Sequence, residues 1–425
     1  MQDPSTLTRK FQLDTLWNVA SLAVLAASGI LLNVVIARAA GAEALGVFNQ
    51  VFAIYIFLSQ LSVGGIHLSV LKQVSHHVDD PQRCSRITVS ALTACFALST
   101  AVGLLTFGLG ELVGRALGSP AVGTGMLWIA PGLVFFALNK VLLNALNGAA
   151  AMRAYAVFQA LRFVLIVGVV VAILVQGWPA ATLAASLTAA EVVLTPLLLI
   201  TIQRRLWPLR LSAHRQSWLR EHLSFGARGF LSGALGEINT RVDILVLGVF
   251  TSDVRVGIYS FAAILAEGFS QLPIVLRRNV DPLLGAAFAS GDLERIGRHA
   301  RELRRVFVPA MAAIGAVAVL GYPLALELLV GAGDFAASSR VFTILMIGVV
   351  INSAYRPFLG ILLQSGNPGR HTLLVAALVA ANLIGNVLLI PWLGLDGAAC
   401  ATALVFVLEA LLIKWVAARV CGVPL

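Results

Sequence analysis

Charge is the first thing that this sequence lacks. Only 12% of its 425 residues are Asp, Glu, Lys or Arg, whereas 59% are hydrophobic. A soluble domain carries about 25% charged residues, so there is too little charge here to cover a soluble surface. Apolar runs of about 20 residues recur along the whole chain, as membrane-crossing helices require. The composition therefore predicts an all-α polytopic membrane protein.

Cysteine and the common catalytic motifs are also scarce. The four cysteines form no CxxC pair, so neither a disulfide framework nor a zinc site is indicated. No GxxxxGK[ST] phosphate loop and no HExxH zinc motif is present. The only cluster of histidines and acids, "HHVDD" at 76–80, reads as a solvated loop. We therefore expect no enzyme activity, no cofactor and no bound metal.

The excess of positive charge follows membrane topology. The net charge is +10, which in a soluble domain suggests nucleic acid. Here the basic residues gather in alternate loops, as the positive-inside rule describes, and no basic patch is interleaved with aromatics. The sequence therefore predicts no nucleic-acid partner.

Twelve spans are expected from the apolar runs. They lie near residues 15–38, 44–70, 87–109, 124–146, 154–176, 181–203, 224–248, 256–280, 306–328, 338–363, 371–392 and 397–417. About 19 basic residues fall in the N-terminus, the even-numbered gaps and the C-terminal end, against four in the odd gaps. This asymmetry predicts that both termini are cytoplasmic.

The two halves of the chain repeat each other. Glu191 and Glu409, the lone acids of spans six and twelve, are 218 positions apart, as are Gly148 and Gly366. The segment 45–61 resembles 256–272 at an offset of 211. A repeated six-span unit is typical of transporters whose substrate site lies between two lobes. We expect an N-terminal lobe at 1–205, an amphipathic cytoplasmic linker at 206–223, and a C-terminal lobe at 224–425.

Ionisable side chains inside the spans are numerous. Each costs roughly 2.5–3.5 kcal/mol to insert, so it should face protein or water rather than lipid. The set comprises Lys140, Arg162, Glu191, Arg228, Glu237, Arg241, Asp243, Glu267, Arg277, Arg278, Arg356 and Glu409. Glu237 and Arg241 stand four residues apart, so they could form an ion pair on one face of a helix. This structural explanation is as well supported as a functional role for the two residues.

Arg356 lies next to a proline inside a predicted span. Pro357 follows it and should break span ten, which is tolerated only beside protein or water. Lys140 maps by the 218-residue offset to position 358, so two cations at similar depth suggest an anion-binding cavity. For Lys140, Arg277 and Arg278 an alternative remains open, because they lie near enough to helix ends to reach lipid headgroups.

Side-chain amides are the second class of candidate. Asn139 in span four and Asn352 in span ten could meet the hydroxyl groups of a sugar. Amides in membrane helices also serve as ordinary hydrogen-bonding contacts between helices, and that alternative stays open for each of them.

Four segments carry a resemblance to a known family. They are "ARAAGAEALGVFNQ" (37–50), "RVDILVLGVFTSDVRVGIYSFA" (241–262), "DPLLGAAFASGDLERI" (281–296) and "LIPWLGLDGAACATAL" (389–404). In this order and spacing, the chain resembles the polysaccharide-biosynthesis flippases, the O-antigen (Wzx-type) branch of the multidrug/oligosaccharidyl-lipid/polysaccharide exporter superfamily. Twelve spans match this branch better than the lipid II flippases, which typically have fourteen.

The resemblance implies a fold, a substrate and a location. It implies about twelve helices in two pseudo-symmetric six-helix lobes that form a V-shaped bundle like that of MATE transporters and MurJ. It implies transport of a polyprenyl-diphosphate-linked oligosaccharide across a bacterial inner membrane, by alternating access. The partners implied are this lipid-linked oligosaccharide, membrane lipids, and a polysaccharide polymerase or glycosyltransferases.

The resemblance implies that Arg241, Arg356 and Arg277 hold the diphosphate or anionic sugars. Arg38 matches the arginine of the family's first-span motif, which ends the span, so a purely interfacial role stays open for it. With Lys140, which the internal repeat suggests, these are the five cations expected to bind diphosphate or anionic glycan. Glu237, Asp243 and Glu267 are candidates for ion coupling, although the family commonly has Asp at position 243, so that Asp243 could be architectural. Two other functions remain open: an ion-coupled multidrug or cation antiporter, which would need an acidic cavity, and a membrane scaffold for glycan synthesis.

Overall fold

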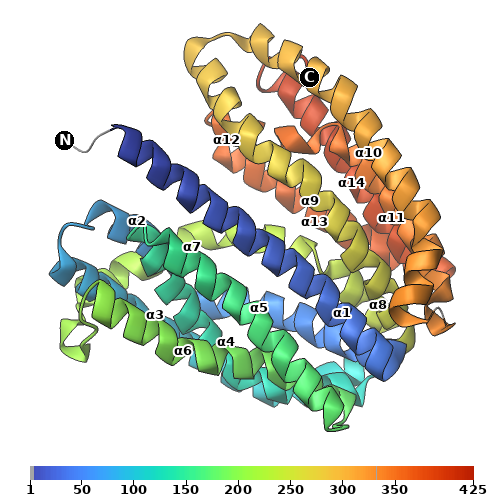
Figure 1. Ribbon diagram of the computed structural model, residues 1–425, viewed down its shortest axis with the longest axis horizontal. Helices are drawn as coiled ribbons and strands as arrows, with labels where there is room; N and C mark the ends of the chain where they lie inside the picture. The colour runs from blue at the N-terminus through green and yellow to red at the C-terminus, as the bar shows by residue number, and fades with distance from the viewer. Residues whose placement is uncertain (1–3, 332) are drawn as a thin grey trace. The chain divides into compact units, whose positions relative to one another are not determined.

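The chain is helical, with no strand in the part that the computed structural model describes (Figure 1). The backbone is described at residues 4–331 and 333–425, and side chains are described there except at 4–23, 26 and 231–233. The helices form two compact units. The first comprises Met1–Ala40 and Gln50–Glu237, and the second comprises Gly41–Asn49 and Ile238–Leu425. The linker expected at 206–223 packs within the first unit.

All twelve predicted spans fall on helices, but three of them, spans one, two and seven, are arranged differently from the expectation. Ten helices among the described residues are long and apolar enough to cross a membrane. The first two spans share one helix, α1 (Pro4–Val63), which bends at Gly41, where φ is 79°. Span seven is split into α7 (Gln216–Asn239) and α8 (Val242–Phe250). The all-α membrane fold is therefore confirmed, with bends and breaks that composition does not reveal.

The first unit is built around α4, which packs against its neighbours α2, α3, α5 and α6. Its remaining elements are α2 (Ile66–His76), α3 (Pro81–Ala116), α4 (Pro120–Gly148), α5 (Met152–Val175), η1 (Ala180–Ala184), α6 (Ala185–Arg205) and η2 (Leu211–Ala213). Asp80 and Ser119 cap α3 and α4 by accepting backbone N–H groups, and each is followed by proline at the first helical position.

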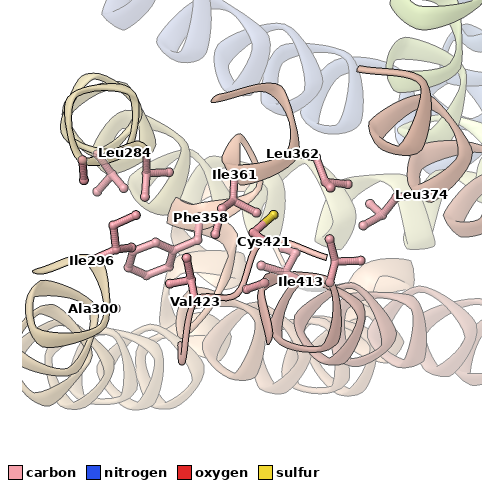
Figure 2. Close-up of a cluster of buried hydrophobic side chains, with 14 of the residues drawn as sticks. Leu284, Ile296, Ala300, Phe358, Ile361, Leu362, Leu374, Ile413, Cys421 and Val423 are labelled. Carbon is pink, nitrogen blue, oxygen red and sulfur yellow. The ribbon is translucent and has the colours of Figure 1, made fainter. Parts of the chain in front are cut away.

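The second unit has a hydrophobic core to which α9, α10, η4, α12, α13 and α14 all contribute. After α8 come α9 (Asp253–Ser290), α10 (Leu293–Val330), η3 (Gly333–Ala337), α11 (Ser338–Ser353), η4 (Arg356–Phe358), α12 (Ile361–Gln364), α13 (Pro368–Leu393) and α14 (Leu395–Arg419). Figure 2 shows Phe358 between Ile296 of α10 on one side and Ile413 of α14 on the other, with Leu284 of α9 nearby. Phe358 therefore ties the broken helix of span ten into the core.

The segment 41–49 of α1 lies against the start of α9 through two glycines. A Cβ added at Gly46 would stand 1.8 Å from the carbonyl oxygen of Asp253, and one at Gly257 would stand 1.9 Å from that of Ala42. Only glycine allows so close an approach of two backbones. Gly46 and Gly257 are 211 residues apart, so the two copies of the repeated motif pack on each other.

Candidate functional site

A buried triad of Asn139, Glu191 and Arg162 links three helices of the first unit. Arg162 Nε lies 2.8 Å from one carboxylate oxygen of Glu191, and Arg162 donates from Nη2 to the other at 3.3 Å. Asn139 donates to the same carboxylate at 2.7 Å. The hydroxyl of Thr195 donates to the Asn139 carbonyl oxygen at 2.9 Å. The carboxylate is thus held from two sides, as a buried charge requires.

The second unit contains a matching triad of Asn352, Glu409 and Arg356. Asn352 donates to the Glu409 carboxylate at 2.9 Å and to the Phe406 carbonyl oxygen at 3.0 Å. Arg356 donates from Nη1 to the same carboxylate at 2.6 Å. Glu191 and Glu409, at equivalent positions of the repeat, thus each have an asparagine and an arginine partner, although the two arginines come from different positions of the repeat.

The two triads differ in how completely they are hydrogen-bonded. The position equivalent to Thr195 at the 218-residue offset is Ile413, which has no hydroxyl to donate. Accordingly, the Asn352 carbonyl oxygen is a buried atom without a hydrogen-bond partner among the described residues. Arg356 Nε, like Arg162 Nε, also makes no well-directed hydrogen bond there. A guanidinium has five N–H donors. Arg356 therefore keeps donors for a ligand while one nitrogen binds Glu409.

Arg356 stands in a true interruption of a membrane span. Helix α11 ends at Ser353, and residues 356–358 form the short turn η4 before α12 begins at Ile361. Pro357 has no backbone N–H to donate to the carbonyl of Ser353, four residues earlier, where α11 ends. The break predicted from the sequence is confirmed, and the Arg356 side chain there is 22% exposed.

A second interruption, which the sequence did not indicate, carries Arg241. Helix α7 ends at Asn239, and α8 begins at Val242. The amide of Asn382 on α13 donates to the backbone carbonyl of Asn239 at 3.1 Å, so the end of α7 is satisfied from outside. Arg241 lies 3.3 Å from a carboxylate oxygen of Glu267 on α9.

The other predicted cations have varied surroundings. Arg277 pairs within α9 with Asp281 at 3.2 Å, and its side chain is 25% exposed. Lys140 lies 5.6 Å from the centre of the Phe136 ring, and Arg38 is exposed. Arg162 and Arg356 each bind a repeated glutamate, although at the 218-residue offset Arg162 corresponds to position 380 and Lys140 to position 358.

The predicted acids and amides are placed as follows. Asp243 is 7% exposed and accepts hydrogen bonds from Tyr259 and from the backbone N–H of Ile244, which suits an architectural role. Glu267 pairs with Arg241, and Glu237 is exposed at the end of α7. Asn139 and Asn352, predicted to bind glycan, are 0% and 2% exposed and donate to the triad glutamates. The five cations, three acids and two amides predicted from the sequence remain candidate site residues.

The class of protein is clear from the helices and their charges: a multi-pass helical membrane protein with ion pairs and broken spans inside the bilayer. A family model described as "Polysaccharide biosynthesis protein" matches residues 14–272, more than half of the chain. The chain belongs to this family, which confirms the resemblance; the motifs at 37–50 and 241–262 lie inside the matched residues.

Relatives and solved structures agree with this assignment. The "Probable flippase AglR" of Haloferax volcanii is 26% identical over 181 residues, which cover 40% of this chain and 36% of that relative. The chain thus matches about a third of that relative's length. An inward-facing multidrug resistance MATE family transporter of the MOP superfamily has a TM-score of 0.77 at 15% identity, covering 95% of both chains.

The lipid II flippase MurJ, in an inward closed conformation, has a TM-score of 0.75 at 13% identity. The likeness covers 94% of this chain and 87% of MurJ. At such identities, the similarity to the MATE transporter and to MurJ shows a shared fold.

Proposed function

We propose that this protein moves a polyprenyl-diphosphate-linked oligosaccharide from the cytoplasmic to the periplasmic leaflet of a bacterial inner membrane by alternating access. The observation that carries the proposal is the pair of interrupted spans in the second unit, each with an arginine at the break. Broken membrane helices occur where a span lines a substrate path. An arginine there suits an anionic group, because its planar fork binds phosphate oxygens.

Diphosphate would bind at Arg356 in competition with Glu409. The arginine uses one nitrogen for the carboxylate, and its Nε has no partner among the described residues. Phosphate oxygens accept such charge-assisted hydrogen bonds strongly. Arg241, Arg277, Lys140 and Arg38 are the further cations that we propose along the path, and family membership supports the lipid-linked oligosaccharide as cargo.

The ion pairs disfavour the alternative of a cationic-drug antiporter. Such a protein needs carboxylates free to hold a cation, but Glu191, Glu267, Asp281 and Glu409 each lie beside an arginine. The second alternative, a scaffold for glycan synthesis without enzyme activity of its own, gains nothing from costly breaks inside spans. Polymerase and glycosyltransferase partners remain proposals.

The test is translocation by the purified protein in proteoliposomes that contain a fluorescent polyprenyl-diphosphate oligosaccharide. Losing a charge-assisted hydrogen bond of about 1.5–3 kcal/mol should slow Arg356→Ala and Arg241→Ala by roughly ten- to a hundredfold. Arg115→Ala removes an exposed arginine paired with Glu111, and it should transport at the wild-type rate. Wild-type rates for both span variants would remove these residues from the mechanism.

Loss of folding is controlled by measuring the amount and the melting temperature of each variant in detergent. Ethidium efflux from the same vesicles tests the antiporter: its stimulation by a cation gradient, with no movement of the lipid-linked oligosaccharide, would overturn the proposed function.

A further inference from the structure

A pocket of about 330 Å³ lies in the first unit, apart from both span interruptions. Its walls come from α3, α4 and α6, and its lining is Val89, Leu92, Thr93, Phe96, Leu138, Leu142, Thr195 and Leu199. Three residues of the segment after α6, Leu209, Arg210 and Leu211, complete it. Arg210 is the one charged side chain among these lining residues. The pocket is thus an apolar cavity with a single guanidinium.

The segment that carries Arg210 is held firmly on α3. The hydroxyl of Ser85 donates to the carbonyl oxygen of Pro208, and the backbone N–H of Arg215 donates to the hydroxyl of Ser90 at 2.9 Å. Trp207 is 4% exposed and anchors the start of the segment. In Figure 1, the yellow-green chain after α6 runs beside the start of α3. The position of Arg210 over the pocket is therefore built into the fold.

The depth of the pocket matches a lipid chain. Leu142 lies six residues from the end of α4, and Thr195 lies ten residues from the end of α6. At 1.5 Å per residue, the pocket extends roughly 9–15 Å inward from those helix ends. Arg204, Arg205 and Arg210 mark the same end as the basic, cytoplasmic side predicted by the positive-inside rule.

We propose that this pocket binds an acyl chain of an anionic phospholipid of the cytoplasmic leaflet, with the phosphate on Arg210. A soluble anion would gain nothing from the apolar walls, and a zwitterionic lipid would gain less from the guanidinium. Basic pockets between membrane helices on the cytoplasmic side suit anionic headgroups. Leu211, 86% exposed beside Arg210, offers a further apolar contact for the lipid.

The pocket touches the first triad. Thr195 lines it and also donates to Asn139, which in turn donates to Glu191. A bound chain therefore packs against the residue that completes the triad's hydrogen bonds, and it should raise the stability of the first unit. This assignment does not depend on the transported substrate.

The test is native mass spectrometry of the purified full-length protein in detergent, with phosphatidylglycerol and phosphatidylcholine of identical chains in competition. The wild type should retain phosphatidylglycerol selectively, and Arg210→Ala should lower that selectivity by roughly fivefold. Arg220→Ala removes an exposed arginine of α7 outside the pocket, and it should leave the selectivity unchanged. Equal retention of both lipids by the wild type, or no loss in Arg210→Ala, overturns the proposal.

A pocket-filling variant tests the apolar part. Thr93→Trp should reduce retention of both lipids; if it does not fold, Arg210→Ala still decides. If Thr93→Trp folds and retains both phospholipids as the wild type does, the proposal that they bind in this pocket is overturned. Decaprenyl phosphate in equal amount should not displace phosphatidylglycerol; if it does, the pocket belongs to the polyprenyl chain instead.

Discussion

At the scale of single residues, the two triads explain how glutamates come to lie inside membrane helices. Each carboxylate receives an amide and a guanidinium from neighbouring elements, so its charge is compensated locally. Burying an ion pair gives little net stability, but removing one partner leaves an uncompensated charge. The triads therefore act as a constraint on how α4, α5 and α6 pack, and equally on α11 and α14.

Glu191→Ala should be strongly destabilising, because it leaves the Arg162 guanidinium, whose side chain is 10% exposed, without its acid. We expect a loss of about 3–5 kcal/mol, the cost of breaking a buried pair. The measurement is thermal unfolding in detergent, followed by tryptophan fluorescence. Glu111→Ala is the matched control, because Glu111 and Arg115 pair at side-chain exposures of 79% and 76% and should contribute less than about 1 kcal/mol. Equal melting temperatures for the two variants would contradict this role of the triad.

At the scale of elements, hydrophobic length predicted the helices but not their continuity. The break at Pro357 was indicated by the proline, which removes a helical hydrogen bond, although Pro131 and Pro196 lie inside the unbroken helices α4 and α6. The break before Val242 has no proline; it depends on Asn382 of α13 reaching the end of α7, a contact 143 residues away in sequence. In the same way, Arg162 and Glu191 were recognised from the sequence as charges inside spans. That they form an ion pair depends on which faces α4, α5 and α6 turn toward one another, and the sequence alone does not give this.

The contact between Gly46 and Gly257 is the element-scale feature most easily tested. Gly46→Ala or Gly257→Ala would place a Cβ within 2 Å of a backbone oxygen, so α1 and α9 must separate. We expect either variant to lower the yield of monodisperse protein and its melting temperature sharply. Gly168→Ala in α5 is the control: a Cβ there meets nothing within 4 Å, so the change should be neutral or stabilise by about 0.5–1 kcal/mol. Wild-type behaviour of both contact variants would show that the helices can move apart without cost.

At the scale of the whole molecule, the charge asymmetry of the loops predicts the direction in which the chain crosses the membrane. Loop arginines and lysines concentrate in alternate loops, which predicts that the turn before α3 lies in the cytoplasm and the turn after α5 in the periplasm. The helix order agrees, since α3, α4 and α5 each run the length of a span between these turns. The direction decides which leaflet faces Arg210 and from which side the proposed cargo would enter.

Cysteine labelling in whole cells checks this orientation. In a background without the four native cysteines, Gly177→Cys in the turn after α5 should react with a membrane-impermeant maleimide. Asp79→Cys, in the turn before α3, should react only after the cells are opened, because it would face the cytoplasm. Both turns are exposed in the folded chain, so accessibility differs only by the side of the membrane. The reverse labelling pattern would show the opposite orientation in the membrane. It would contradict both the binding of a cytoplasmic-leaflet phospholipid at Arg210 and the entry of cargo from the cytoplasm.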